Sequence, residues 1–297
     1  MWNIQLITLY CTVCRYYDSG ISEQVQRFSN NSRPKFTDEE IITVYLWGII
    51  QRRFEVKAIY NYTQMHLLDW FPQLPSYQAF DRRLGELAPA FSTLVECFMQ
   101  TKPVQVIDMN MLLTDSLPIM LAKASRSGRA KVARELCSKT FCASRDQWYY
   151  GMKLHIVAQR RMGTLPFPKF IFASEAACHD LPIAKQILST SDITNTLLLG
   201  DKAYADAAWQ QDLRDKGIHL LTPTKLSRGQ SDPFPGGNAL DTSICRARQP
   251  IEAFFNWLHE KTGIQIASKV RSRKGLLVHI FAKLAAALFV LSLSFYP

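Results

Sequence analysis

The sequence lacks a cysteine framework. Its seven cysteines are scattered over 297 residues, and the odd number leaves at least one of them without a partner. Such a chain is typical of a reducing cytoplasm, where thiols stay free. Cys11 and Cys14 form a Cys-x-x-Cys pair, but no second pair follows at the spacing of a zinc ligand set. We therefore expect neither a disulfide scaffold nor a structural zinc site.

Targeting and membrane-spanning segments are lacking as well. The N-terminus has no charged stretch followed by a long apolar one, so we expect no signal peptide. His279 and Lys283 interrupt the apolar C-terminal stretch, and its uninterrupted part, Leu284 to Phe295, is too short to span a bilayer. This stretch predicts a buried helix, and we expect no membrane partner.

The sequence has, in contrast, an excess of positive charge. Lysine and arginine number 35 against 25 aspartates and glutamates, which gives a net charge of +10. A basic surface attracts polyanions, and nucleic acid is the most common large one. A merely basic soluble protein would have the same balance, so charge alone leaves both interpretations open.

The first hundred residues have helical patterns. Thr37 and Glu40 form a capping box ahead of a helix over 41–53. A second helix is expected over 55–70 and a third from Ser76, after a proline-containing turn. The third helix carries Arg82 and Arg83, so the three helices form either a DNA reader like a helix-turn-helix or a plain bundle.

The pattern changes after Thr101, where short β-prone stretches begin. Strands are expected over 104–107, 111–114, 154–158, 169–173, 196–199 and 220–222, with helices over 180–188 and 250–261 and a final apolar helix. Pro250 suits the first position of the second of these helices. The order predicts an α/β layer with helices covering a sheet. We expect a helical N-terminal region over 1–100 and an α/β domain over 101–297.

Three carboxylates lie at unusual places in this pattern. Asp115 ends the apolar run 112–114, and Asp201 ends the run 197–200. At a strand end, an aspartate is either a turn residue or a ligand. Glu252 flanks the apolar stripe of the helix after Pro250, and an ion pair with Arg248, four residues earlier, is an alternative role for it.

Two strand-end aspartates and one helix glutamate together suit hard divalent cations. Mg²⁺ prefers oxygen ligands and commonly takes a few carboxylates together with substrate phosphate. Two such ions can hold the attacking and leaving oxygens of a phosphoryl displacement. Metal-dependent phosphoryl transfer is therefore one hypothesis for this set.

Several motifs in register give the set a family context. Together they resemble bacterial insertion-sequence transposases of the DDE type, closest to the IS-982 family, and the resemblance extends from about Phe36 to the C-terminus. The stretches that carry it are Leu113–Ile119, Tyr149–His155, His179–Asp180, Leu199–Tyr204 and Arg248–Phe254. The resemblance implies an RNase H-like core with Asp115, Asp201 and Glu252 as catalytic, metal-binding residues. Asp108 also ends an apolar run, but the Ser-Leu-Pro context favours Asp115.

The resemblance also implies a reaction and its partners. A transposase of this type would cut DNA at terminal inverted repeats and join the 3′-hydroxyl to target DNA, with two Mg²⁺ or Mn²⁺ ions. We expect it to act as a homodimer or larger assembly on DNA in the bacterial cytoplasm, associated with the nucleoid. An RNase H-like nuclease without strand transfer and a decayed copy that only binds DNA are the alternatives.

Basic residues near these acids are candidates for DNA contact. The run Lys123, Arg126, Arg129, Lys131 and Arg134 follows the first aspartate and is either a phosphate-binding surface or a solvated loop. Further candidates for DNA contact are Lys153, His155, Lys202 and Arg248. His155 is equally well explained as a core histidine. Trp148, Tyr149 and Tyr150 are candidates for stacking on an unpaired base, although core packing explains them too.

Overall fold

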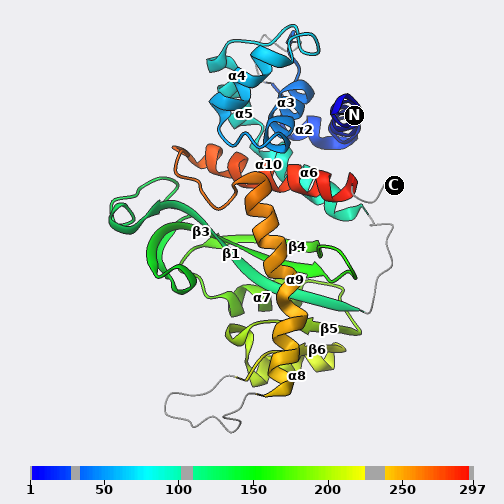
Figure 1. Ribbon diagram of the computed structural model, residues 1–297, viewed down its shortest axis with the longest axis vertical. Helices are drawn as coiled ribbons and strands as arrows, with labels where there is room; N and C mark the ends of the chain where they lie inside the picture. Colours follow the sequence, from blue (N-terminus) through cyan, green and yellow to red (C-terminus); the bar gives the residue numbers. More distant parts are fainter. Residues whose placement is uncertain (1, 28–33, 102–109, 225–237, 294–297) are drawn as a thin grey trace. The chain divides into compact units, whose positions relative to one another are not determined.

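A computed structural model describes residues 2–27, 34–101, 110–224 and 238–293 (Figure 1). The chain forms two compact units. The helical unit comprises Met1–Pro103, Lys131–Ala133 and Leu258–Pro297, and the sheet unit comprises Val104–Ala130 and Arg134–Trp257. The expected strand over 104–107 and Asp108 lie outside the described residues.

The helical unit confirms the helical pattern of the first hundred residues. Thr37 and Glu40 form both hydrogen bonds of the capping box that opens α3. Ser76 caps α5, as the turn before it predicts. A π-helical turn at Tyr17–Ile21 joins the first two helices and contains Gly20 at a φ of 139°. The helices are α1 (Trp2–Tyr16), α2 (Ser22–Gln24), α3 (Asp38–Ile50), α4 (Val56–His66), α5 (Tyr77–Glu86), α6 (Ala88–Gln100) and α10 (Arg273–Leu293).

The last helix, α10, is the buried helix that the sequence predicts. It is long and apolar enough to cross a membrane, but most of it is buried against α6, α3 and α5. Its two polar interruptions bind the turn after α9. His279 Nε2 lies 2.8 Å from the carbonyl oxygen of Ile264, and Lys283 Nζ donates to that of Gly263 at 3.3 Å. Both polar side chains thus have a backbone partner inside the helical unit.

Within its described residues, the sheet unit contains a six-stranded mixed sheet. The strand order is β2-β3-β1-β5-β6. In addition, β4 pairs with Met152–Gln159 of β3, which follow the residues that pair with β2. The pairs made by β3 are antiparallel, whereas β1–β5 and β5–β6 are parallel. The strands are β1 (Met111–Lys123), β2 (Ser138–Cys142), β3 (Gln147–Gln159), β4 (Phe167–Glu175), β5 (Thr196–Leu199) and β6 (Ile218–Leu221).

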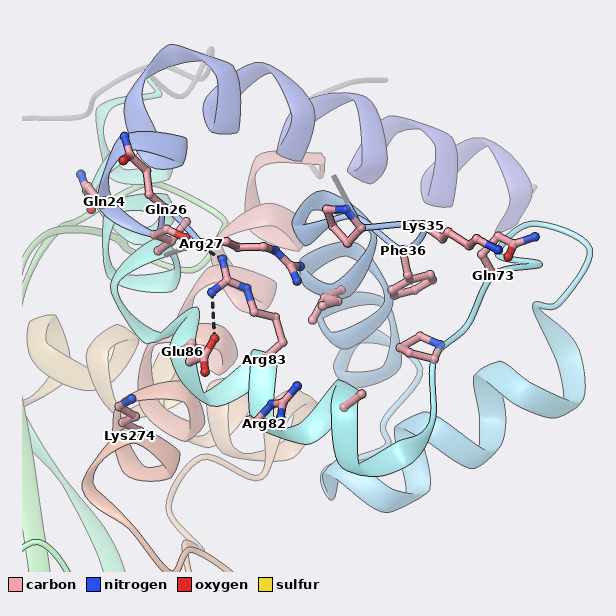
Figure 2. A pocket seen from close by; sticks show the side chains of 15 residues that line it. Gln24, Gln26, Arg27, Lys35, Phe36, Gln73, Arg82, Arg83, Glu86 and Lys274 are labelled. Atoms are coloured by element: carbon pink, nitrogen blue, oxygen red, sulfur yellow. Dashed lines mark hydrogen bonds and ion pairs between the residues drawn. The ribbon is translucent and has the colours of Figure 1, made fainter. Parts of the chain in front are cut away.

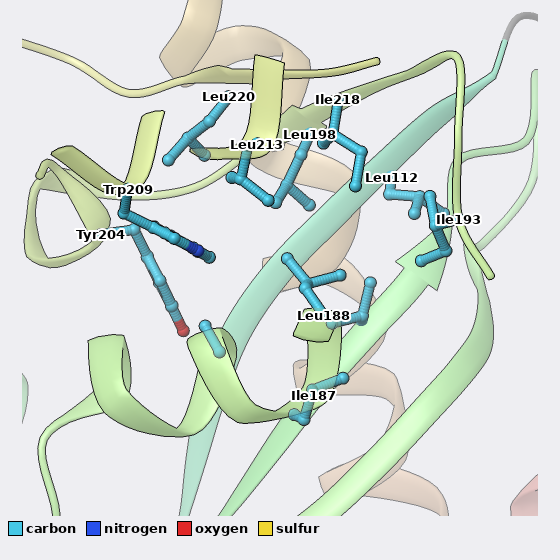
Figure 3. Packing of buried hydrophobic residues seen from close by; sticks show 12 residues of the cluster. Leu112, Ile187, Leu188, Ile193, Leu198, Tyr204, Trp209, Leu213, Ile218 and Leu220 are labelled. Atoms are coloured by element: carbon cyan, nitrogen blue, oxygen red, sulfur yellow. The ribbon is translucent and has the colours of Figure 1, made fainter. Parts of the chain in front are cut away.

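Side-chain alternation assigns the two faces of this sheet. Leu112 and Val157 join the core formed with α7 (Asp180–Ser189) and α8 (Ala207–Asp215), as Figure 3 illustrates. Residues on successive strand positions point to opposite faces. Asp115, an odd number of positions from Leu112, therefore points away from α7. There it meets Arg248 of α9 (Ala239–Thr262).

The predicted fold class, an α/β core preceded by a helical region, is confirmed. The prediction that Pro250 begins a helix is wrong, because α9 begins at Ala239 and contains Pro250 in its interior. The expected division also differs from the packing. The sequence analysis placed 101–297 in one domain, whereas Leu258–Pro297 packs with the N-terminal helices because the apolar faces of α6 and α3 are covered by α10.

Candidate active site

Asp115 lies inside β1, between two neighbours that satisfy its carboxylate. The strand continues to Lys123, so the prediction that it ends at residue 114 is wrong. Its Oδ1 accepts a hydrogen bond from the Ser116 backbone N–H at 2.8 Å, and its Oδ2 accepts one from Arg248 Nη2 at 3.2 Å. The carboxylate is only 21% exposed. Asp115 is therefore a partly buried acid with one cation beside it.

Asp201 follows β5, the parallel neighbour of β1. Leu112 pairs with Leu198 and Leu113 with Leu199. The pairing ends there, and Asp201, two residues after Leu199, lies close enough for its charge to raise the pKa of Asp115. Asp201 Oδ1 accepts a hydrogen bond from the Ala203 backbone N–H at 2.8 Å, which holds the carboxylate at the strand end. The two predicted aspartates are thus brought together.

The pKa of Asp115 reflects this arrangement. Desolvation raises the pKa from 3.8 to about 6, and the Ser116 N–H and Arg248 oppose the rise. The negative charges of Asp201 and Asp180 also contribute to the raised pKa. Like-charged carboxylates in a low-dielectric site favour a shared proton or a bound cation. The site is therefore electrostatically suited to positive charge.

Glu252 lies on α9, one turn after Arg248. The predicted apolar stripe is buried as expected, with Ile251, Phe254 and Leu258 inside the protein and Glu252 exposed beside it. Arg248 pairs with Asp115 and not with Glu252, so the alternative role for Glu252 is not observed. Residues four apart share a helix face, which places Glu252 on the side of α9 that carries Arg248.

The three predicted carboxylates do not form a complete set of metal ligands. Within the described parts of the chain, no group of three or more histidine, cysteine, aspartate or glutamate side chains is close enough to hold a metal ion. Asp201 is near enough for its charge to act on Asp115, but the three predicted carboxylates do not converge as one set of ligands. The two aspartates supply oxygen donors and excess negative charge, which is the donor set that a hard cation prefers.

Asp180 is a site residue that the sequence analysis assigned no role. It begins α7 and accepts a hydrogen bond from Lys153 Nζ at 3.1 Å. His155 Nδ1 lies 3.7 Å from the same carboxylate oxygen, while its Nε2 lies 2.8 Å from Ser174 Oγ. The His179-Asp180 pair was visible in the sequence, but nothing local indicated that Asp180 would pair with a strand residue.

The predicted DNA contacts divide into exposed and internal residues. Lys153 pairs with Asp180, and His155 is only 2% exposed. Burial lowers the pKa of His155 to about 4, the Asp180 charge opposing this, so the ring is neutral at pH 7. His155 is the core histidine of the alternative interpretation, and Arg248 is buried as well. The exposed candidates are Lys123, Arg126, Arg129, Lys131, Arg134 and Lys202.

Comparison with protein families supplies the context for this site. Residues 112–289 match the family model described as the transposase DDE domain, and this match covers more than half of the chain. The chain belongs to this transposase family. No curated protein matches it significantly. The matched region of the transposase contains Asp115, Asp201 and Glu252 and begins on β1.

The helical unit of the transposase contains a separate basic cavity. The cavity has a volume of about 1090 Å³ and is lined by Arg27, Lys35, Arg82, Arg83 and Lys274, among others (Figure 2). Arg83 is not available to DNA, because its guanidinium binds Asp38 through Nε at 2.9 Å and Nη2 at 2.6 Å. Arg82 is exposed. The third predicted helix, α5, therefore contributes one arginine to the protein core and one to the surface.

Proposed function

We propose that this transposase cuts DNA at the ends of an insertion sequence of the IS-982 type and joins the freed 3′-hydroxyl to target DNA. The observation that carries the proposal is the partly buried Asp115 carboxylate, which feels the negative charge of Asp201 and is paired with Arg248. A desolvated acid next to a like charge is typical of catalytic sites.

Two divalent ions, Mg²⁺ or Mn²⁺, are the cofactors that we assign to this site. Asp115 and Asp201 would hold them, and Glu252 would join from α9. The raised pKa of Asp115 supports this assignment, because the charges that raise it would be offset by a cation. Bound divalent ions would activate the attacking oxygen and stabilise charge on the transferring phosphoryl group.

The chain's own residues would hold and orient the reacting groups. The Ser116 N–H fixes one oxygen of Asp115, which leaves the other oxygen to exchange Arg248 for a different cation. Arg248 would then be free to donate to a phosphate oxygen, for which a planar guanidinium is well suited. The Lys153–Asp180 ion pair would restrict movement on the face of β3 that is opposite to the Asp115 side.

Apart from Arg248, DNA binding would rest on the exposed cations and not on Lys153 and His155. We propose that Lys123, Arg126, Arg129, Lys131, Arg134 and Lys202 contact DNA phosphates, and that the cavity of the helical unit contributes to recognition of the terminal inverted repeats. The proposal also includes a homodimer or larger assembly on DNA and a location in the bacterial cytoplasm at the nucleoid.

The test compares Asp201→Asn with Asp212→Asn, an exposed aspartate on α8. Both variants are incubated with DNA carrying the inverted repeats that flank the coding region, with and without Mg²⁺. Asp201→Asn should lose cleavage and joining, whereas Asp212→Asn should retain both. Cleavage without joining would identify a nuclease, and binding without metal-dependent cleavage by the wild-type protein would identify a DNA-binding protein only.

A further inference from the structure

An exposed aromatic pair lies at one end of the sheet, on the hairpin formed by β2 and β3. Trp148 and Phe141 face each other across the two strands, with ring centroids 5.6 Å apart and planes at 62°. Trp148 is 51% exposed and Phe141 is 45% exposed. The neighbouring Tyr149 and Tyr150 are buried. Core packing therefore explains the two tyrosines but leaves the tryptophan without an internal role.

Cations surround this aromatic pair. Lys139 Nζ lies over the Trp148 ring, 4.9 Å from its centroid, and beside the backbone of Gly128. Arg145 is exposed in the hairpin turn, next to the acidic Asp146. The loop after β1, which carries Arg126 and Arg129, contacts β3 through the turn Ala124–Arg126. The hairpin end of the sheet thus combines open ring surface with predominantly positive charge.

This combination suits nucleic acid better than a protein surface. Lysine is depleted from the cores of protein–protein interfaces, whereas exposed rings among cations are typical of surfaces that stack bases and hold phosphates. The hairpin is also held firmly, because β3 pairs with β1 as well as β2 and Gly151 allows the β1 backbone to approach closely. An aromatic ring on a rigid strand loses little entropy when it binds a base.

The hairpin lies far from the two aspartates along the strands. Asp115 pairs with Ile156, eight residues from Trp148 on β3, and eight residues of an antiparallel strand extend roughly 27 Å. That length corresponds to roughly eight base pairs of duplex DNA at 3.4 Å per step. A base held at Trp148 would therefore belong to the flank of a cleavage site at Asp115 and not to the scissile position.

We infer that Trp148, supported by Phe141 and Lys139, stacks on an unpaired or unstacked DNA base in the flank of the cleavage site. This inference rests on the proposed function, since it assumes that the bound polymer is DNA. The stacking surface would distinguish distorted DNA from a fully paired duplex, because only an unstacked base offers a free face to the ring.

The test measures binding of labelled oligonucleotides to the full-length protein by fluorescence anisotropy. One probe is a duplex with a single unpaired base, and the other is the fully paired duplex of the same length. Trp148→Ala should weaken binding of the first probe by about 10-fold or more, while binding of the second changes less than about 2-fold. Trp148→Phe, which keeps a ring, should retain most of the preference. Trp70→Ala, at a tryptophan of similar exposure in the helical unit, is the matched control.

Three outcomes would overturn the inference. In the first, wild type and Trp148→Ala each bind the two probes with equal affinity. In the second, Trp70→Ala weakens binding of the probe with the unpaired base as much as Trp148→Ala does. In the third, Trp148→Ala loses self-association in the absence of DNA. The last would make the hairpin an interface between copies of the chain. Asp201→Asn separates this inference from the proposed function, because it should abolish cleavage and preserve the preference for the unpaired base. If the wild-type protein does not cleave DNA, but Trp148→Ala loses the preference for the unpaired base, then the inference stands and the proposed function is wrong.

Discussion

Asp115 is a carboxylate whose surroundings disfavour its charge. Desolvation is the main cause that raises its pKa from 3.8 to about 6, and the Ser116 N–H and Arg248 oppose this rise. Between these pH values the native protein binds a proton that the unfolded chain does not, so stability falls as pH rises through this interval. The penalty is absent below about pH 3.8 and complete above about pH 6.

Asp115→Asn should therefore stabilise the protein at pH 8. Asparagine resembles the protonated acid, so the free energy of unfolding should rise by up to roughly 3 kcal/mol at pH 8. The difference between variant and wild type should vanish near pH 3.5, where both side chains are neutral. Urea unfolding at the two pH values measures this. An Asp115→Asn protein less stable than wild type at pH 8 would show that the Arg248 ion pair outweighs desolvation.

Glu252 differs from Asp115 because it is exposed and forms no ion pair within the described residues. Glu252→Gln should change the free energy of unfolding by less than about 0.5 kcal/mol. If Glu252 is a metal ligand, the same variant should lose Mg²⁺-dependent cleavage by about 100-fold or more while binding DNA normally. Glu260→Gln, at an exposed glutamate of the same helix, is the control. Normal cleavage by Glu252→Gln would remove Glu252 from the site.

Gly151 illustrates a residue that the β1–β3 pairing requires. A Cβ atom at this position would lie 1.9 Å from the carbonyl oxygen of Ile119, so the strands could not keep their spacing. Gly151→Ala should destabilise the protein by roughly 1–3 kcal/mol, as overpacking commonly does. Gly128→Ala, where the nearest atom would be 3.9 Å away, should be close to neutral. Thermal unfolding of the two variants tests the contrast, and equal midpoints would contradict it.

At the scale of elements, the sequence predicted those whose signals are local. The capping box at Thr37 located the start of α3, and the apolar run 196–199 located β5. Two elements were not predicted: β2, because Ser138–Cys142 is short and only partly apolar, and α8, because only Trp209 and Leu213 of its residues are buried. The predicted form of α9 was too short, because Pro250 resembles a helix start and the chain before it is polar.

The acidic residues of the candidate site could be predicted from the sequence, but the ion pair between Arg248 and Asp115 could not. Asp201 follows β5 as the sequence predicts, whereas Asp115 lies inside β1 and not at a strand end. The Arg248–Asp115 contact joins residues far apart in the chain, and a local rule pairs Arg248 with Glu252 instead. The burial of His155 and the role of Asp180 likewise depend on how α7 packs on the sheet, which no local pattern contains.

The helical unit depends on one buried ion-pair network that joins its first helices. Asp38, at the start of α3, binds Arg83 of α5, contacts Arg27 and accepts a hydrogen bond from Tyr17 at 3.0 Å. Desolvation would raise the pKa of Asp38, but Arg83 and Arg27 outweigh it and lower the pKa. The stabilisation is present above the unfolded pKa and is lost as pH falls through the folded one.

Asp38→Asn should therefore cost about 3–5 kcal/mol at pH 7, because it leaves buried guanidinium groups without their counter-charge. The difference from wild type should shrink under acid conditions below pH 3.8, where wild type also loses the carboxylate. Glu86→Gln is the control, since Glu86 binds the same arginine but is 43% exposed, and it should cost less than about 1 kcal/mol. Urea unfolding at pH 7 and pH 3 distinguishes the variants. Equal costs for the two would show that burial of the pair contributes little.

At the scale of the whole molecule, the chain contributes to the helical unit from both of its ends. The boundary between the units falls at Trp257 and Leu258, inside α9, and the following residues include α10. The helix that carries Arg248 and Glu252 thus continues into the unit built by the N-terminal helices. Because α10 is buried against α6 and α3, a chain limited to 101–297 would expose its apolar surface to water.

The excess of positive charge also belongs to the whole molecule, and it predicts how binding responds to salt. A protein with a net charge of +10 that neutralises DNA phosphates releases counterions, so log affinity should fall linearly with log salt concentration. Each phosphate contact contributes roughly 0.9 to the slope. Replacing Lys123, Arg126 and Arg129 together by glutamine should therefore flatten the slope by as much as roughly 2.7, if all three contact phosphates. Replacing Lys169, Arg214 and Lys216, which are also exposed, removes the same charge elsewhere on the sheet unit. Equal slopes for the two triple variants would mean that net charge, and not the loop after β1, attracts the DNA, whereas a flatter slope for the first alone would place phosphates on that loop.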